Sequence, residues 1–229
     1  MTRTEAIALL RSNANQRGID HWQKQNLTGG KWDSFGLGLT QLKKLAKQVG
    51  RDHDLALELW KEPNIDCKTL AILIDEPKLV TRAQVDEQVV DLDFWMLSHA
   101  YVSNLLSKVP FARELADEWR DERDDVKRRC SWMLIYALAS KDKKLTDSYF
   151  APLVEQIRSE LAGEENFVRD AMNNALMAIG MRSAALHTQA LAAAKEIGTV
   201  EVDYGDNSCN AVDVVKHLSG DRVKQKFKV

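Results

Sequence analysis

Apolar residues three and four positions apart recur along most of the chain, which is the spacing of amphipathic helices. A first helix is predicted over residues 4–15. Thr81 is predicted to open a later one, with Gln84 three positions on completing a capping box. The same spacing marks residues 39–49, 54–60, 67–77, 91–106, 121–140, 145–163, 165–183 and 186–198. We therefore predict an all-α chain of about ten helices of ordinary length.

Glycine and proline mark the places where these helices end. The segment 27–38 holds four glycines and is the clearest loop in the chain. Pro63, Pro77 and Pro110 stand at breaks between periodic segments. The breaks recur every ~35–40 residues, the period of two-helix HEAT-type repeats. The sequence thus predicts a HEAT-like helical repeat array, an α-α superhelix. A plain globular bundle is the alternative, because the repeats resemble one another only weakly.

The pattern changes after residue 198. Val200 and Val202 alternate with acidic residues over 199–205, which predicts a short extended C-terminal piece. An apolar segment at 211–218 follows, and then a basic end, residues 221–229, that is expected to be a frayed, solvated terminus. We predict a HEAT-like repeat domain over residues 1–198 and a C-terminal extension over residues 199–229.

Composition limits the class of protein. The formal net charge of −2 gives no global positive field for nucleic acid, although a local basic face can still bind phosphates. The densest apolar run, residues 133–139, is much shorter than the ~20 residues of a membrane-spanning helix. The N-terminus predicts a helix and no signal peptide. Three cysteines without C-x-x-C spacing indicate a reducing, cytoplasmic setting, with no disulfide framework, metal site or cofactor expected.

Two groups of residues are candidates for function. Trp95 and His99 are four positions apart, which places both on one helix face. Basic residues that could contact phosphate occur at Lys43, Lys44, Lys127, Arg128, Arg129 and Lys144. The alternatives are ordinary ones: Trp95 as a core residue, His99 as a structural histidine, and the basic cluster as a solvated turn.

The ordered series of segments resembles the AlkD-like DNA alkylation repair proteins, a family built from HEAT-like repeats. Residues 39–60 and 67–81 look like the family's second and third repeats. Residues 91–106, 126–143 and 165–186 continue in family order and spacing, and 200–213 is similar to an extension found on some members. The resemblance spans roughly residues 30–215.

This resemblance implies a protein that grips duplex DNA and releases N3- or N7-alkylated purines without flipping the base. In the family, two tryptophans and an aspartate contact the damaged deoxyribose. The Trp-x-x-x-Asp pattern falls on Trp95 and His99, the family's arginine on Arg129, and its second tryptophan on Asn174. Trp95 and Arg129 match the family pattern. The two positions that differ from it, His99 and Asn174, are those that the resemblance assigns to contacts with the damaged deoxyribose.

Losing the aspartate is expected to be costly. A carboxylate beside the oxocarbenium-like sugar stabilises its positive charge, and histidine carries no negative charge in either protonation state. At an effective dielectric constant of ~20, a charge at ~4 Å contributes about 4 kcal/mol, on the order of a thousandfold in rate. We therefore expect a monomeric protein that binds the phosphate backbone of duplex DNA, with weak, changed or absent glycosylase activity. A non-catalytic helical-repeat module for protein interaction is the alternative.

Overall fold

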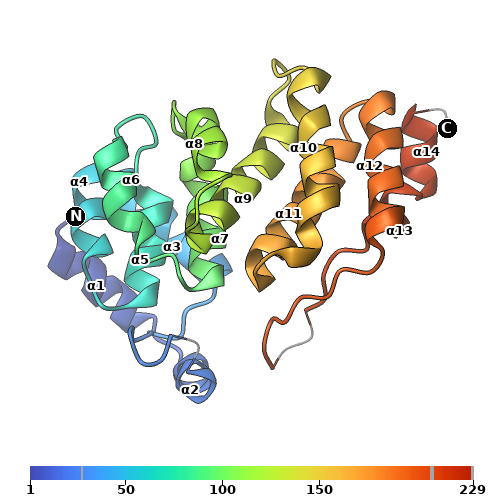
Figure 1. Ribbon diagram of the computed structural model, residues 1–229. Helices are drawn as coiled ribbons and strands as arrows, with labels where there is room; N and C mark the ends of the chain where they lie inside the picture. Colours follow the sequence, from blue (N-terminus) through green and yellow to red (C-terminus); the bar gives the residue numbers. More distant parts are fainter. Residues whose placement is uncertain (27, 207–208, 228–229) are drawn as a thin grey trace. The chain divides into compact units, whose positions relative to one another are not determined.

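The computed structural model describes residues 1–26, 28–206 and 209–227. Over these residues it contains fourteen α-helices, two 3-10 helices and no β-strand, which confirms the all-α prediction (Figure 1). The chain divides into two compact units, Met1–Pro110 and Phe111–Val229. Each unit has its own buried apolar core.

The first unit is built around one central helix, α5. Its elements are α1 (Arg3–Ser12), α2 (Gln16–Gln25), α3 (Leu39–Val49), α4 (His53–Trp60), α5 (Ile65–Ile74), α6 (Arg82–Val89), α7 (Trp95–Asn104) and the 3-10 helix η1 (Leu106–Lys108). Helix α5 packs against α3, α4 and α7, and nine of its ten residues are buried. A helix surrounded on several sides buries most of its surface, and the apolar run 70–74 of α5 supplies much of this core. In Figure 1, α2 lies below the ends of α3, α5 and α7.

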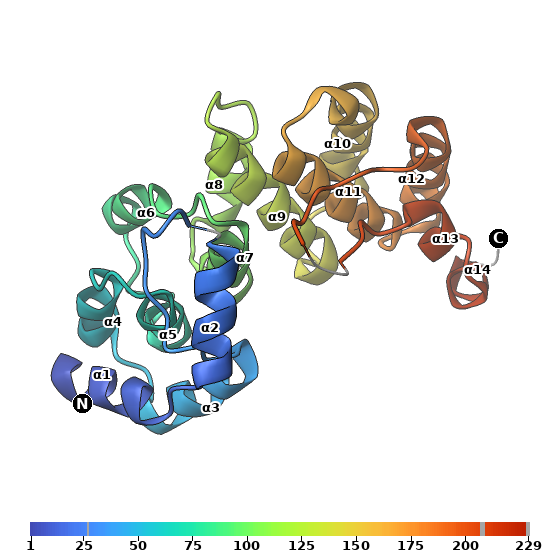
Figure 2. The ribbon, with the colours of Figure 1, turned by 90° about the horizontal axis from the view of Figure 1, so that it is seen from below.

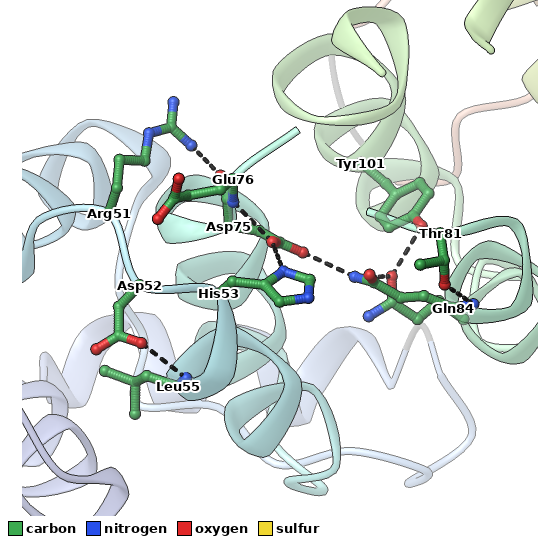
Figure 3. Close-up of polar contacts among 10 residues, drawn as sticks. Arg51, Asp52, His53, Leu55, Asp75, Glu76, Thr81, Gln84 and Tyr101 are labelled. Atoms are coloured by element: carbon green, nitrogen blue, oxygen red, sulfur yellow. Dashed lines mark hydrogen bonds and ion pairs between the residues drawn. The ribbon is translucent and has the colours of Figure 1, made fainter. Parts of the chain in front are cut away.

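The start of α6 differs from the predicted capping box. The Thr81 Oγ1 atom accepts a hydrogen bond from the Gln84 backbone N–H at 3.1 Å, as predicted. The Gln84 side chain turns instead to Asp75, to which its Nε2 donates at 2.8 Å. Asp75 also contacts His53, with 2.6 Å between Oδ1 and Nδ1 (Figure 3). A buried carboxylate requires hydrogen-bond partners. The Gln84 side chain therefore bonds to Asp75 and does not complete the capping box.

The second unit is a set of packed helix pairs. Its elements are α8 (Ala112–Trp119), α9 (Asp125–Lys141), α10 (Asp147–Glu160), the 3-10 helix η2 (Leu161–Gly163), α11 (Asn166–Gly180), α12 (Ala184–Ile197), α13 (Val214–Leu218) and α14 (Asp221–Phe227). Helix α9 packs against α8 and α11, and α12 packs against α10 and α11. Trp132, on α9, is fully buried in this core.

The segment that follows α12 is held against α11 by hydrogen bonds. Residues 199–204 form neither helix nor strand and run across α11 (Figure 2). The Asn166 side chain fixes them there, since it donates to the Asp203 carbonyl at 2.7 Å and accepts from the Asp203 N–H at 2.8 Å. Helix α13 packs on α11 and α12. The predicted division of the chain at residue 198 stays a prediction.

The prediction of a frayed basic end is wrong for residues 221–227, which form α14. Val223 is 5% exposed, and the Phe227 ring lies 5.1 Å from the ring of His187 on α12. Val223 and Phe227 are four positions apart and therefore share one face. This face anchors the end of the chain. Residues 228–229 of the predicted terminus lie outside the described residues.

Candidate functional site

Trp95 and His99 border one aromatic hollow in the first unit. The hollow has a volume of about 430 Å³, and α2, α3, α5 and α7 all contribute to its walls. Helix α7 begins at Trp95, later than the periodicity suggested. Trp95 is half-buried and His99 is exposed, whereas Leu97 and Ala100 between and beside them are buried. His99 is therefore not buried in the core, and its alternative role as a structural histidine stays open.

A second tryptophan, Trp22 of α2, lines the same hollow. Its ring meets Phe94 edge to face, with centroids 5.4 Å apart, and its Nε1 donates to the Trp32 carbonyl at 3.0 Å. These two contacts hold the indole in one orientation. The sequence pattern did not predict this helix, although Ile19 and Trp22 are spaced as on one helix face. The signal was weak because α2 has no side-chain cap.

Asp66 supplies a carboxylate to the wall of the hollow, and it is 2% exposed. It accepts hydrogen bonds from Ser34 Oγ at 2.8 Å and from the Phe35 N–H at 2.6 Å. Burial raises the pKa of Asp66, and the hydrogen bond from Ser34 opposes that rise. The carboxylate thus anchors the loop before α3 to α5. Its sequence position gave no signal, because an acid in the first turn of a helix is ordinary.

Some of the basic candidates are exposed lysines, and the others contact an aromatic ring or a carboxylate of the protein. Lys43 and Lys44 are exposed on α3, in the first unit, and Lys144 is exposed just after α9, in the second. Lys127 is half-buried, with its Nζ 6.0 Å from the centroid of the Trp119 ring. The three lysines on the surface are therefore open to solvent and to phosphate.

The two arginines at the start of α9 are held by the protein. Arg129 is 6% exposed, and its guanidinium carbon lies 5.8 Å from the centroid of the Phe167 ring. Arg128 forms an ion pair with Glu164, whose side chain is 7% exposed. Phosphate binding by Arg128 and Arg129 stays a prediction.

Asn174 lies on α11 in a cluster that the sequence pattern did not predict. Its Nδ2 donates to the backbone carbonyl of Asp170 at 2.8 Å and to the Oδ1 of the same residue at 2.9 Å. The Tyr204 hydroxyl donates to this Oδ1 at 2.7 Å, and its ring lies 6.2 Å from that of Phe167. Burial and the neighbouring Asp170 carboxylate raise the pKa of Tyr204. Asn174, which the resemblance aligns with the family's second tryptophan, thus lies in a carboxylate–phenol cluster, and that correspondence stays a prediction.

The described residues give little support for metal binding or for a reactive thiol at Cys67 or Cys130. No group of three or more His, Cys, Asp or Glu side chains among them could hold a metal ion. Burial raises the pKa of the Cys67 and Cys130 thiols to about 12, which leaves them protonated near neutral pH. None of the described helices is long and apolar enough to span a bilayer.

Two bacterial proteins are similar to this chain in sequence. The uncharacterised protein Lin0241 of Listeria innocua is 27% identical over 189 residues, which are 81% of this chain and 82% of that protein. The uncharacterised protein Lmo0209 of Listeria monocytogenes is 25% identical over 197 residues, 85% of this chain and 86% of that protein.

A solved structure shares the fold, with a TM-score of 0.82 and 23% identity, covering 99% of this chain and 94% of the other. It is described as a new family of proteins related to the HEAT-like repeat DNA glycosylases with affinity for branched DNA structures. This likeness confirms the predicted HEAT-like helical fold. The sequence profile of the family described as "DNA alkylation repair enzyme" matches residues 6–202. Since this match covers most of the chain, the protein belongs to the DNA alkylation repair enzyme family.

Proposed function

We propose that this protein binds the phosphate backbone of DNA, favours branched structures, and has weak, changed or absent glycosylase activity. The observation that carries the proposal is the exposed His99 beside Trp95 at the rim of an aromatic hollow. The family resemblance places a catalytic aspartate at this position. The protein therefore keeps the surroundings of such a site and lacks its negative charge.

Hydrolysis of the glycosidic bond explains why this exchange matters. The sugar becomes oxocarbenium-like in the transition state, and a nearby carboxylate stabilises it by about 4 kcal/mol at an effective dielectric constant of ~20. A neutral His99 could orient a water molecule, whereas a protonated His99 would repel the developing cation. The carboxylate that does line the hollow, Asp66, is buried and accepts hydrogen bonds from the loop before α3.

Asn174, where the family resemblance implies a tryptophan, should also lower glycosylase activity. An amide offers no aromatic face to a sugar or a base, and stacking of one base on an aromatic side chain is worth about 1–3 kcal/mol. The Asn174 amide is instead bonded to Asp170. This exchange therefore also argues against efficient excision.

Exposed lysines and the structural likeness support the binding part of the proposal. Lys43, Lys44 and Lys144 are exposed and can neutralise phosphates without reading sequence. The protein of similar fold is described as having affinity for branched DNA structures, and we extend that preference to this chain.

Base release from methylated duplex DNA tests the chemistry. The wild-type protein should release 7-methylguanine and 3-methyladenine very slowly, and His99→Asp should raise the rate because it returns a carboxylate to an exposed position. His21→Asp is the matched control, since His21 is exposed on α2 and does not line the hollow. Rapid release by the wild type, or no gain in folded His99→Asp, would count against the role assigned to residue 99.

Titration with fluorescent duplex and four-way-junction DNA tests the binding. We expect both to bind at low salt, the junction more tightly. If neither binds at low salt, DNA binding is ruled out and the alternative stands, a helical-repeat module for protein interaction.

A further inference from the structure

We propose that the aromatic hollow of the first unit accepts one unpaired nucleobase, such as a branched DNA presents at its branch point. This inference rests on the proposed function and deepens it, because it names the part of the DNA that the protein would recognise. The ligand is defined by its chemistry: a flat, neutral aromatic ring attached to a phosphodiester chain.

The walls of the hollow suit a flat ring. Trp22 from α2 and Trp95 from α7 are both half-buried and both line it, so each presents part of an indole face or edge. The contacts of Trp22 with Phe94 and with the Trp32 carbonyl fix its orientation before any ligand arrives. Fixed aromatic side chains favour binding because little conformational entropy is lost. Every base has a π-face, so such walls are tolerant of sequence.

The rim of the hollow carries two large apolar side chains that are exposed to solvent. Only six large apolar side chains are exposed among the described residues, and two of them, Leu39 at 42% and Met96 at 41%, line this hollow. Single exposed apolar residues are common, but a pair flanking one concavity indicates a binding site. The rim can therefore bury apolar surface against the edge and sugar of an inserted nucleotide.

Charge around the hollow fits a neutral ring on an anionic chain. The carboxylate in the wall, Asp66, is 2% exposed, so no lining residue presents an open negative charge. Lys43 is four positions after Leu39 on α3, which places it next to the rim, and it is exposed. The phosphates on either side of an inserted nucleotide would meet this lysine and Lys44. His99 also lines the hollow and is exposed, and an imidazole nitrogen can donate to or accept from a base edge.

Energetics select an unpaired base over a paired one. Taking a base out of a duplex costs unstacking and unpairing, and the cost is least where the base is already unpaired. Bulges, and branch points whose arms are not fully paired, supply such bases. A hollow that stacks one base would thus convert a general affinity for phosphate into a preference for branched DNA.

Fluorescence of 2-aminopurine, an adenine analogue, tests this inference. One DNA carries the analogue unpaired in a single-base bulge, and a second carries it paired with thymine in the same sequence. With wild-type protein we expect quenching of the unpaired analogue by stacking, none of the paired one, and tighter binding of the bulged DNA. Trp95→Ala should abolish the quenching and lower the affinity for the bulged DNA alone by about five- to 150-fold. Trp95→Phe should keep most of both.

A variant that fills the hollow gives a second, independent test. Gly38 lines the hollow, has an ordinary φ of −75°, and would place a Cβ atom with no other atom within 4 Å. Gly38→Leu should therefore fold normally and exclude the base. Gly163→Leu is the matched control, because Gly163 also has open space around its would-be Cβ atom and lies in the second unit. Circular dichroism checks the fold of every variant.

The outcomes separate the two proposals. Equal affinity for both DNAs with unchanged fluorescence, or full quenching by folded Gly38→Leu, would overturn the base-binding hollow and leave DNA binding intact. Absence of binding to any DNA would overturn the proposed function as well.

Discussion

At position 174 an asparagine stands where the family resemblance implies a tryptophan, and its environment explains how the amide is used. Its Nδ2 and the hydroxyl of Tyr204 both donate to the Oδ1 of Asp170. Tyr204 belongs to the segment after α12, so the phenol ties the C-terminal part of the chain to α11. Asn174 therefore has a structural role, which is evident only from its contact with Asp170 and the contact of Asp170 with Tyr204.

Removing the Tyr204 hydroxyl should weaken this tie. Tyr204→Phe loses a hydrogen bond to a charged group, and since the side chain is half-exposed we expect a loss of about 1 kcal/mol in the free energy of unfolding at neutral pH. Urea denaturation measures it. Tyr136→Phe is the control, because Tyr136 is 39% exposed on α9 and should change the unfolding free energy very little.

The same variant changes the response to alkaline pH. The pKa of Tyr204 in the folded protein is raised above the ordinary value of 10.0 by burial and by Asp170. Above pH 10 the unfolded chain therefore loses this proton first, and the contribution of Tyr204 to stability declines as the pH rises toward its folded pKa. Tyr204→Phe should show a smaller decline than the wild type in this range, whereas an identical decline would contradict the assigned shift.

At the scale of the element, α9 shows how a helix end is completed from a distance. The guanidinium of Arg182, two residues after α11, donates to four backbone carbonyls between residues 138 and 145, at 2.7 to 3.3 Å. It also lies 4.2 Å from the centroid of the Phe150 ring. The last four carbonyls of a helix have no partner within it, and here one side chain donates to two of those of α9, Leu138 and Ala139, and to two carbonyls that follow the helix.

Arg182→Lys should destabilise the second unit in spite of conserving the charge. An ammonium group cannot reproduce the planar fork that reaches several carbonyls while stacking on a ring. We expect a loss of about 2–3 kcal/mol in the free energy of unfolding, measured by chemical denaturation. Arg158→Lys is the control, because the ion pairs of Arg158 with Glu155 and Glu196 are exposed and should matter little. Equal effects of the two changes would refute the capping role.

The local sequence predicts some helices of this protein well and others poorly. The predicted helix at 39–49 coincides with α3, because its leucine spacing is strong and Gly38 and Gly50 flank it. Helices α2 and α8 were missed, and neither has a side-chain cap at its N-terminus. Helix α14 was mistaken for a frayed end, because its polar composition hides Val223 and Phe227, which pack only in the folded chain.

At the scale of the molecule, a net charge of −2 requires that any attraction to DNA be local. Lys43 and Lys44 are exposed on α3, the helix that contributes Leu39 and Leu42 to the aromatic hollow. The double variant Lys43→Ala/Lys44→Ala should weaken binding to every DNA sequence alike. It should also reduce the slope of log affinity against log salt by about one for each phosphate that the variant no longer neutralises.

Fluorescence titrations over a range of salt concentrations measure this slope. Lys61→Ala/Lys78→Ala is the matched control, since it removes the same charge from exposed positions of the same unit. If both double variants lower the slope equally, binding depends on overall charge and not on α3.

The sequence by itself determined the helical class, the repeat character and the family, because helix periodicity and the order of segments are local properties of the chain. It also identified Trp95 and His99 as neighbours, since a spacing of four residues fixes their common face. These conclusions needed no knowledge of which distant segments meet.

Only the tertiary structure decided what surrounds those residues. It brings Trp22 to the hollow of Trp95 and His99, buries Arg129 against Phe167, and joins Tyr204 to Asp170 from 34 positions away. Such contacts depend on which helix faces are buried against each other, and nothing in the local pattern of either partner records that choice. The exposure of His99, on which the proposed function depends, follows from this packing.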